Sequence, residues 1–372
     1  MKSDSTNNIL HLMGMDSTKY GGIERFNVQL SQQLAEKGFH SVFVYERWPD
    51  VEQFVDDIKA TGAELIVLNS RHHRIRFCKD LWRLLRQYNF CLMHAHFTKA
   101  RFFAVPLAKF YGIRNIVYTF HSTVPPLNKI KFHTRLWYRL CNKYCRIVAV
   151  SKDIENISCQ NWPNSIIRNI YMGINPIPRN REVSRAELGI ADNQLMLMCT
   201  ANFNHIKGLD ILVNAAAQIE KNGDLKNVII YIVGQPEKDR VELQQMIDQM
   251  DLTVYFHLEG ISNKIPLYLQ AADIYVQPSR HEGLPLALME ACAVGLPIVA
   301  SRVGGIPEVA VEGENANLFE TENVTGCADA IHDLIIDKSL RQRFGDHSKE
   351  IYKEKFQLSN NVVKLLDYYK LS

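Results

Sequence analysis

The stretch of sequence that decides the fold is residues 274–308, IYVQPSRHEGLPLALMEACAVGLPIVASRVGGIPE. Its first apolar run, Ile274–Val276, predicts a buried strand, and a polar turn separates that strand from a predicted helix at Leu286–Val294. Pro285 fits the first position of this helix, where its missing N–H breaks no hydrogen bond. A strand that leads through a short turn into a helix is typical of a parallel α/β domain.

The turn and the helix also carry side chains that suit a ligand. Gly283 lets backbone amides approach a ligand closely, and the free N–H groups at the start of a helix bind phosphate well. Glu290 lies roughly 8 Å along the helix axis, where a carboxylate can accept two hydrogen bonds from a ribose diol. Glu282, in the turn, would face what is attached beyond the phosphates. The alternative is that Glu282 is a surface acid and Glu290 a solvated helix residue.

The same alternation of short apolar runs and helical segments extends along the whole chain. In the first half, the predicted strands are Ile9–Met13, Ser41–Tyr45, Leu65–Leu68, Cys91–His94, Ile116–Thr119 and Ile147–Val150. In the second half, they are Leu195–Thr200, Val228–Val233, Val254–His257, Ile274–Val276 and Pro297–Ala300. The predicted helices include Gly22–Lys37, Lys131–Cys145, Leu209–Lys221 and Ile265–Ala271.

The alternation restarts after a Pro-containing joint, so the sequence predicts an α/β protein with two Rossmann-like domains that face each other across a cleft. The predicted N-terminal domain covers residues 1–172, the linker 173–182 and the C-terminal domain 183–350. Residues 351–372 are predicted to form a C-terminal helix that packs back towards the N-terminal domain.

The composition, 47% hydrophobic and 22% charged over 372 residues, excludes a disordered chain, a disulfide scaffold and a polytopic membrane protein. The charge is unevenly distributed, because Leu81 to Lys152 contains 13 Lys or Arg and no Asp or Glu. Nucleic acid, an anionic membrane surface and an anionic substrate would each explain this region. No C-x-x-C pair, signal peptide or spanning segment is present in the sequence, which predicts a cytoplasmic protein.

Residues 274–308 resemble the retaining GT-B glycosyltransferases that carry a Glu-x7-Glu motif, the family 4-like enzymes of bacterial surface-polysaccharide synthesis. The motif here runs from Glu282 to Glu290, and Ser301–Glu308 matches the family's S-x-x-G-G-x-x-E element. The likeness covers most of the chain. Its other matched residues are the strand-end Ser segment Ala149–Lys152, the phosphate-binding pair Lys207-Gly208, Tyr268 and Asp273.

The resemblance implies a role for each matched residue. Glu290 would bind the nucleotide ribose, Glu282 the hydroxyls of the donor sugar, and Lys207 the departing diphosphate, unless Lys207 is only a solvated residue beside a turn. The implied catalytic residues are His121, Glu282 and Lys207. The implied donor-binding residues are Gly21, Gly22, Asn202, Lys207, Glu259, Gly260, Glu282, Gly283, Leu284, Pro285 and Glu290.

One position departs from the family pattern. The family usually has an Arg five residues before the Lys, and this chain has Asn202 there. One cation of the expected diphosphate site is therefore missing, and His205, Arg280 and His281 are the candidates to replace it. The departure keeps open a non-catalytic relative that binds nucleotide-sugar or membrane.

Two further features lie in the first half. Gly21 and Gly22 form a loop able to wrap a phosphate or sugar, although a plain turn has the same composition. The resemblance places this loop opposite the donor and His121 near the donor sugar and acceptor. His94 and His96 alternate across a strand end, so they are predicted to point to opposite faces as structural residues. The family's chemistry is metal-independent, and no metal or other cofactor is expected.

Basic and apolar residues are interleaved between residues 129 and 146. The basic members are Lys129, Lys131, Arg135, Arg139, Lys143 and Arg146, and the apolar ones are Phe132, Leu136, Trp137, Tyr138, Leu140 and Tyr144. Such a helix suits an anionic membrane leaflet, and several family members act on lipid-linked acceptors. The alternatives are core packing with solvated cations, and RNA binding. Because no nucleic-acid motif accompanies the charge, no nucleic acid is expected as a partner.

The implied activity is transfer of a sugar from a UDP- or GDP-sugar to a hydroxyl of a glycan or lipid-linked acceptor. The implied setting is cell-surface polysaccharide synthesis (O-antigen of lipopolysaccharide, capsule or exopolysaccharide) at the inner face of the cell membrane. The N-terminal domain would bind the acceptor and the C-terminal domain the nucleotide-sugar. A nucleotide-sugar epimerase or hydrolase on the same architecture is the alternative enzyme.

Overall fold

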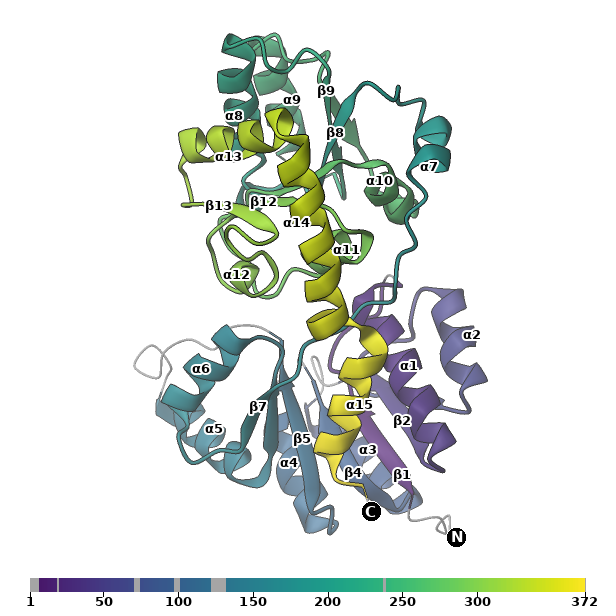
Figure 1. The fold of residues 1–372 in the computed structure, drawn as a ribbon. Coiled ribbons are helices and arrows are strands. Elements are labelled where there is room, and N and C mark those ends of the chain that lie inside the picture. The colour runs from purple at the N-terminus through teal and green to yellow at the C-terminus, as the bar shows by residue number, and fades with distance from the viewer. Residues whose placement is uncertain are drawn as a thin grey trace. The chain divides into compact units, whose positions relative to one another are not determined.

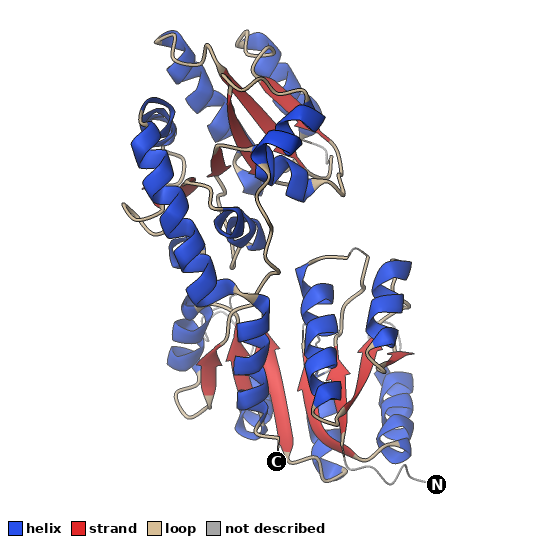
Figure 2. Cartoon of the chain, turned by 45° about the vertical axis from the view of Figure 1, so that its right-hand side comes forward, coloured by secondary structure: helices blue, strands red, loops and turns tan. Residues whose placement is uncertain are grey.

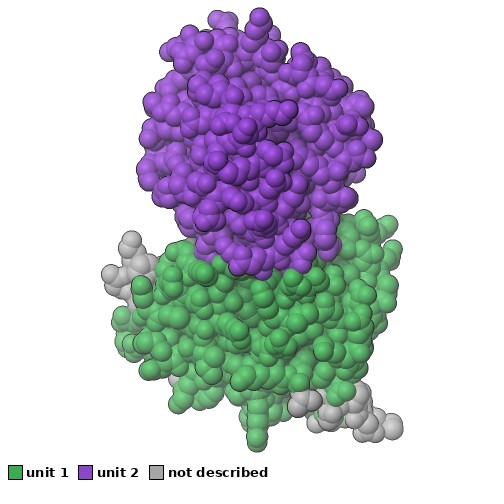
Figure 3. Space-filling model, in the orientation of Figure 1, with its two compact units in different colours: residues 1–174, 358–372 green, residues 175–357 purple. Residues whose placement is uncertain are grey.

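The computed structural model describes residues 7–18, 20–69, 74–96, 101–121, 132–236 and 239–371. The chain forms two compact units (Figure 3): unit 1 contains Met1–Ile174 and Leu358–Ser372, and unit 2 contains Asn175–Gln357. Each unit is a parallel sheet with helices on both faces (Figure 1, Figure 2). This arrangement confirms the predicted class, an α/β protein with two Rossmann-like sheets.

Within its described residues, unit 1 has a seven-stranded parallel sheet of order β3-β2-β1-β4-β5-β6-β7. The strands are β1 Asn8–Leu12, β2 His40–Tyr45, β3 Glu64–Val67, β4 Phe90–Ala95, β5 Asn115–Phe120, β6 Arg146–Ala149 and β7 Ile167–Asn169. The helices are α1 Gly22–Glu36, α2 Glu52–Ala60, α3 Arg74–Gln87, α4 Arg101–Phe110, α5 Phe132–Tyr144, α6 Lys152–Asn161 and α15 Leu358–Tyr369. The strand order reverses between β1 and β4, and open α/β sheets bind ligands beyond the carboxyl ends of strands at such a point.

The two faces of this sheet are buried against different helices. Ile9 of β1 points to the face where Leu30 of α1 and Leu365 of α15 pack. Its neighbour Leu10 points to the opposite face, against Leu81 of α3 and the residues of α4 and α5. Successive strand residues alternate between faces, so a sheet covered on both sides needs the continuous apolar runs seen in the sequence.

Hydrogen bonds from the first residues of β5 and β6 to the last carbonyls of α15 attach this helix to the sheet. The side-chain amide of Asn115 donates to the carbonyl of Tyr369 at 2.6 Å, and Arg146 Nη2 donates to the same oxygen at 2.9 Å. Arg146 also donates to the carbonyl of Tyr368 and to the side-chain oxygen of Asn115. The last turn of a helix leaves its carbonyls unpaired, and these bonds satisfy two of them. Arg146, a member of the predicted basic region, is therefore an anchor for α15.

The described residues of unit 2 form a six-stranded parallel sheet of order β10-β9-β8-β11-β12-β13. The strands are β8 Leu195–Thr200, β9 Val228–Val233, β10 Phe256–Glu259, β11 Ile274–Gln277, β12 Ile298–Ser301 and β13 Ala316–Phe319. The helices are α7 Arg181–Leu188, α8 Leu209–Lys221, α9 Arg240–Gln249, α10 Ile265–Ala271, α11 Leu286–Val294, α12 Ile306–Val309, α13 Val324–Ile336 and α14 Lys338–Ile351, with short turns at His205–Lys207 and Tyr352–Phe356. The order reverses between β8 and β11, so the carboxyl ends of these two strands mark the ligand-binding edge.

Asp273, directly before β11, joins α7 to this sheet. Its carboxylate accepts hydrogen bonds from Arg185 at 3.0 Å, from Arg181 at 3.0 Å and from the N–H of Met196 at 2.9 Å. Arg185 is 1% exposed and also donates to three backbone carbonyls. A buried cation requires this degree of pairing, so Asp273 joins α7 to the amino ends of β8 and β11, opposite the ligand-binding edge.

Candidate functional site

Glu282 lies in the loop that follows β11, at the centre of a hydrogen-bond network. Its Oε1 accepts from Nζ of Lys207 at 2.7 Å, from Oγ of Ser279 at 2.8 Å and from Nε2 of Gln277 at 2.9 Å. The side chain of Glu282 is 11% exposed and that of Lys207 is 26% exposed, so water screens the ion pair only in part. The structure thus brings together two residues that the sequence analysis selected separately.

A chain of buried hydrogen bonds leads to Glu282 from inside the sheet. The N–H of Thr200 donates to the Tyr275 hydroxyl at 3.3 Å, the hydroxyl donates to Oε1 of Gln277 at 3.2 Å, and the Gln277 amide donates to Ser279 and Glu282. Burial holds the pKa of Tyr275 well above its ordinary value, so the hydroxyl keeps its proton. Each bond donates towards the carboxylate, and the network orients it. The sequence analysis missed Gln277, although a glutamine inside an apolar strand was an available signal.

Glycines allow the backbone to approach this loop closely. At Gly208, where φ is +62°, a Cβ atom would lie 2.0 Å from the carbonyl oxygen of Pro278. At Gly304, where φ is +51°, a Cβ atom would lie 1.9 Å from the carbonyl oxygen of Glu282. The next N–H, of residue 305, donates to the carbonyl of Gly283 at 2.7 Å. Only glycine fits these two left-handed positions. The pair Gly304-Gly305 can therefore pack directly against the backbone of the Glu282 loop.

Helix α11 begins directly after the loop and covers the range that the sequence predicts. Pro285 is its N-cap, one residue before the helical position predicted for it. Gly283 and Leu284 are half-buried in the loop, and Glu290 is half-buried on the helix. The free N–H groups and the dipole at the start of α11 favour an anion. The site therefore combines the Glu282 carboxylate and the N-terminus of α11 from one segment with the ammonium of Lys207 from the turn before α8.

The candidates to replace the missing cation differ in their surroundings. Asn202 is exposed in the loop after β8, and His205 and His281 are exposed as well. The guanidinium of Arg280 is bound on two sides, to both oxygens of Asp210 at 2.7 Å and to Glu322 at 3.0 Å. Its charge is already balanced by these carboxylates. The exposed His205 and His281 are therefore the better candidates to replace the missing cation of the diphosphate site.

Glu259 ends β10 beside two tyrosines. Burial, together with the charge of Glu259, raises the pKa of both Tyr231 and Tyr268. Tyr231 also stacks on His257, with ring centroids 4.5 Å apart. A Cβ atom on Gly260 would meet nothing within 4 Å, so a ligand can approach the backbone there.

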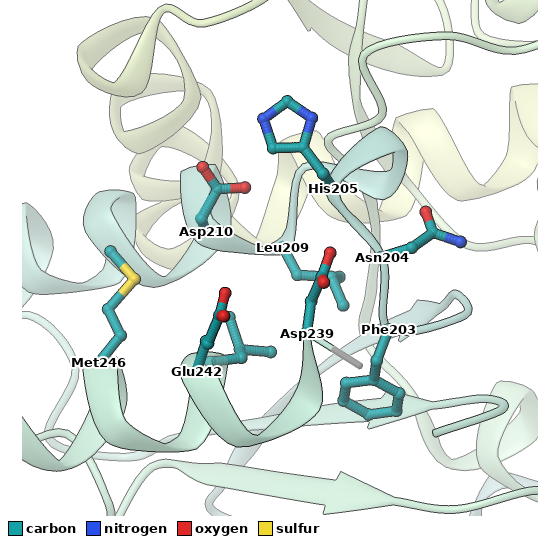
Figure 4. A pocket seen from close by; sticks show the side chains of 9 residues that line it. Phe203, Asn204, His205, Leu209, Asp210, Asp239, Glu242 and Met246 are labelled. Atoms are coloured by element: carbon teal, nitrogen blue, oxygen red, sulfur yellow. The ribbon is translucent and has the colours of Figure 1, made fainter. Parts of the chain in front are cut away.

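A cavity of about 260 Å³ lies beside this site rather than in it. Its apolar lining includes Phe203, Leu243 and Met246, and Figure 4 shows Asp239 and Glu242 projecting from the start of α9 into it. It adjoins the site on both sides of Lys207, at Asn204 and His205 before it and at Leu209 and Asp210 after it. None of the predicted donor-binding residues is among its described lining residues.

The Gly-Gly loop of unit 1 is fixed by a buried carboxylate. Gly21 is the N-cap of α1, and its N–H donates to Oε2 of Glu24 at 3.0 Å. Glu24 is 3% exposed, and its other oxygen accepts from Ser17 at 2.9 Å. The amide of Gly21 is thus already used in capping the helix, while Gly22 is its first residue. Ser151, in the predicted strand-end Ser segment, similarly caps α6.

The histidines of unit 1 do not lie as the sequence predicted. His94 and His96 were expected on opposite faces, but their ring centroids are 4.0 Å apart. The expectation was wrong because residues two apart in a strand point to the same face, and His94 and His96 are two apart at the end of β4. Nδ1 of His96 lies 3.0 Å from Nε2 of His121, and His94 contacts Tyr369 and Thr119. The structure therefore connects His121 to a neighbour that sequence reasoning had set aside.

Helix α5 combines core residues with an exposed apolar and basic face. Tyr138, Cys141 and Cys145 pack in the core, whereas Phe132 is 72% exposed and Leu136 48% exposed. Arg139, Lys143 and Tyr144 are exposed too. Lys129 and Lys131 of the predicted basic region lie outside the described residues. One helix thus carries residues packed in the core and, at other positions, exposed apolar and basic residues.

No group of three His, Cys, Asp or Glu side chains in the described ranges is placed to hold a metal ion. Within the same ranges, no helix combines the length and apolar composition needed to span a bilayer.

Comparison with protein families gives a match for each half of the chain. Residues 20–176 match the model described as Glycosyltransferase Family 4, and residues 180–351 match Glycosyl transferases group 1. Among curated relatives, N-acetyl-alpha-D-glucosaminyl L-malate synthase of Bacillus anthracis is 26% identical, covering 92% of each chain. The UDP-Gal:alpha-D-GlcNAc-diphosphoundecaprenol alpha-1,3-galactosyltransferase of Escherichia coli is 24% identical, covering 94% of this chain and 93% of its own.

Solved structures share the fold along the whole chain. A glycosyltransferase from Rickettsia africae aligns with a TM-score of 0.84 at 18% identity, covering 98% of this chain and 97% of its own. The HepE protein of Anabaena in complex with UDP aligns with a TM-score of 0.81 at 19% identity, covering 97% and 99%.

Proposed function

The chain belongs to the glycosyltransferases that join a family 4 domain to a group 1 domain, and from this premise we propose that it moves a sugar from a UDP- or GDP-sugar to a hydroxyl of a glycan or lipid-linked acceptor. We place the donor in unit 2, the acceptor in unit 1, and the reaction in cell-surface polysaccharide synthesis. The names of two similar proteins support this proposal: one is a galactosyltransferase from UDP-Gal to GlcNAc-diphosphoundecaprenol, and the other was solved in complex with UDP.

The ion pair of Lys207 and Glu282 is the observation that carries the proposal. A diphosphate at the start of α11 would attract the ammonium of Lys207, which stabilises charge as the leaving group departs. Glu282 would keep its bonds to Gln277 and Ser279 and accept hydrogen bonds from hydroxyls of the donor sugar. Glu290 would bind the ribose further along the helix. We propose retention of the anomeric configuration, with the leaving diphosphate taking the proton of the acceptor on the same face.

A thermal-shift screen with UDP, GDP, ADP and their common sugar conjugates, without added metal, tests the donor site. A ligand present at 100 times its Kd stabilises the native state by about 2.7 kcal/mol, which raises the melting temperature measurably. We expect a selective shift with one nucleoside diphosphate, reduced in Glu290→Ala and unchanged in the control Glu242→Ala, whose carboxylate lies on α9. No shift with any nucleotide would contradict the proposed donor site.

We propose in addition that the exposed face of α5 binds an anionic membrane surface. Its apolar residues Phe132 and Leu136 lie beside the cations Arg139 and Lys143. Arg135 lies 5.7 Å from the ring centroid of Phe132, and such pairs of cations and rings suit the headgroup layer. This location would bring unit 1 to lipid-linked acceptors.

Vesicle flotation tests the membrane proposal. Each Lys or Arg near an anionic surface contributes about 1 kcal/mol, so Arg139→Gln combined with Lys143→Gln should weaken binding to phosphatidylglycerol vesicles about 30-fold. The matched control, Lys221→Gln with Lys226→Gln, removes two exposed cations of unit 2 and should leave binding unchanged. Equal loss in both double variants would show a general charge effect and contradict a dedicated face.

A further inference from the structure

Four histidine rings meet at the carboxyl ends of β1, β4 and β5 in unit 1. The ring centroids of His11 and His94 are 6.3 Å apart, those of His94 and His96 4.0 Å, and those of His96 and His121 5.3 Å. Burial lowers the pKa of His11 and of His96 to about 3, and it holds the pKa of His94 and His121 well below the ordinary value. All four rings are therefore neutral near pH 7.

A neutral imidazole has one N–H donor and one acceptor nitrogen, so its contacts restrict which nitrogen carries the proton. His96 Nδ1 and His121 Nε2 are 3.0 Å apart, and one of them must donate. The other nitrogen of His96, Nε2, is buried and has no hydrogen-bond partner among the described residues. Orphaned N–H groups are rarer in protein interiors than under-used acceptors, so the proton of His96 belongs on Nδ1.

We infer that His96 is a positioning residue that fixes the tautomer of His121. His96 donates through Nδ1–H to Nε2 of His121, which leaves the proton of His121 on Nδ1. His121 then offers an N–H donor, and not a basic nitrogen, to its surroundings. The consequence for catalysis rests on the proposed function. His121 would donate a hydrogen bond to an oxygen of the sugar or the acceptor, and it would not remove the proton of the acceptor hydroxyl.

The side-chain geometry of Asn and Gln provides a sharp test. The amide nitrogen of Asn reaches the place of Nδ1 in histidine, whereas the amide of Gln reaches the place of Nε2. His96→Asn should therefore keep the bond to His121, and His96→Gln should lose it. We expect kcat to stay within about threefold in the first variant and to fall about 10- to 100-fold in the second, with KM nearly unchanged.

Nitrogen-15 NMR of the histidine rings reads the tautomer without any enzyme assay. The expected result is a protonated Nδ1 on His121 in the wild type and in His96→Asn, with mixed tautomers in His96→Gln. Tyr369→Phe is the control, since it removes a bond from His94 and leaves the pair of His96 and His121 intact. A protonated Nε2 on His121 in the wild type, or an unchanged tautomer in His96→Gln, would overturn the inference. Absence of transferase activity with the expected tautomers would instead contradict the proposed function alone.

Discussion

Replacement of Glu282 by Gln should lower kcat for sugar transfer by about 10³-fold, because it removes the charge on which the site is organised. In the wild type, one oxygen of Glu282 accepts hydrogen bonds from Lys207, Ser279 and Gln277. An amide can accept some of these bonds, but it cannot balance the ammonium of Lys207 or bind hydroxyls as strongly as a carboxylate does. The melting temperature should change by only about 2–4 °C, as expected for a loss near 1 kcal/mol. Initial-rate kinetics and a melting curve measure the two effects.

Glu242→Gln, on the exposed start of α9, is the matched control and should retain full activity. If Glu282→Gln were as active as this control, the Glu282 loop would not be the donor site. A wild-type protein that binds nucleotide-sugar without turnover would indicate the non-catalytic relative, and donor consumption without acceptor would indicate a hydrolase or epimerase.

Gly304→Ala should lower kcat/KM by about 10²-fold without touching any polar side chain. The added methyl group would lie 1.9 Å from the carbonyl oxygen of Glu282, so the loop must move by at least about 1 Å, and a displacement of that size costs about this factor. The backbone conformation at φ +51° adds a further 1–2 kcal/mol, roughly, of instability for an alanine. The measurement is donor KM and kcat, with the free energy of unfolding from urea titration.

Gly313→Ala separates the two contributions. Gly313 has φ +74° but nothing within 4 Å of an added Cβ, so alanine meets only the backbone cost there. We expect only the backbone part of the stability loss, roughly 1–2 kcal/mol, with normal kinetics. Equal kinetic defects in the two variants would mean that strain, and not displacement of the Glu282 loop, causes the loss.

The strands that the sequence predicted best are those buried on both faces. The predicted range Leu195–Thr200 is β8 and Val228–Val233 is β9, because central parallel strands need unbroken apolar runs. The short strands β7 (IRN) and β13 (ANLF) lie at sheet edges, carry little apolar pattern and were missed. Strand β10 begins at Phe256, two residues later than predicted, since Val254 is 76% exposed in the preceding turn.

The site was predictable where local sequence carries the chemistry. Glu282 and Lys207 could each be predicted as site residues from the turns in which they lie, the helices that follow and the family resemblance. Their ion pair could not be predicted in this way, because it joins residues 75 apart in the chain. Gln277 was overlooked although its bonds to Tyr275, Ser279 and Glu282 lie within its own segment. The partner of His96 is His121, which follows a different strand, so no local pattern shows that contact. His96 was predicted on the wrong side of the sheet, because residues two apart in a strand, such as His94 and His96, share a face.

The location of α15 constrains the order in which the protein can be made and folded. This helix follows unit 2 in the chain, yet Val362, Leu365 and Tyr369 complete the core on the α1 face of unit 1. During synthesis, Ile9 and Leu92 on that face can pack against α1 but lack the α15 part of their core until α15 emerges from the ribosome. Unit 2 is continuous and can fold as soon as residue 357 emerges. Unit 1 is thus completed after unit 2, and a premature stop within α15 would harm the unit that was translated first.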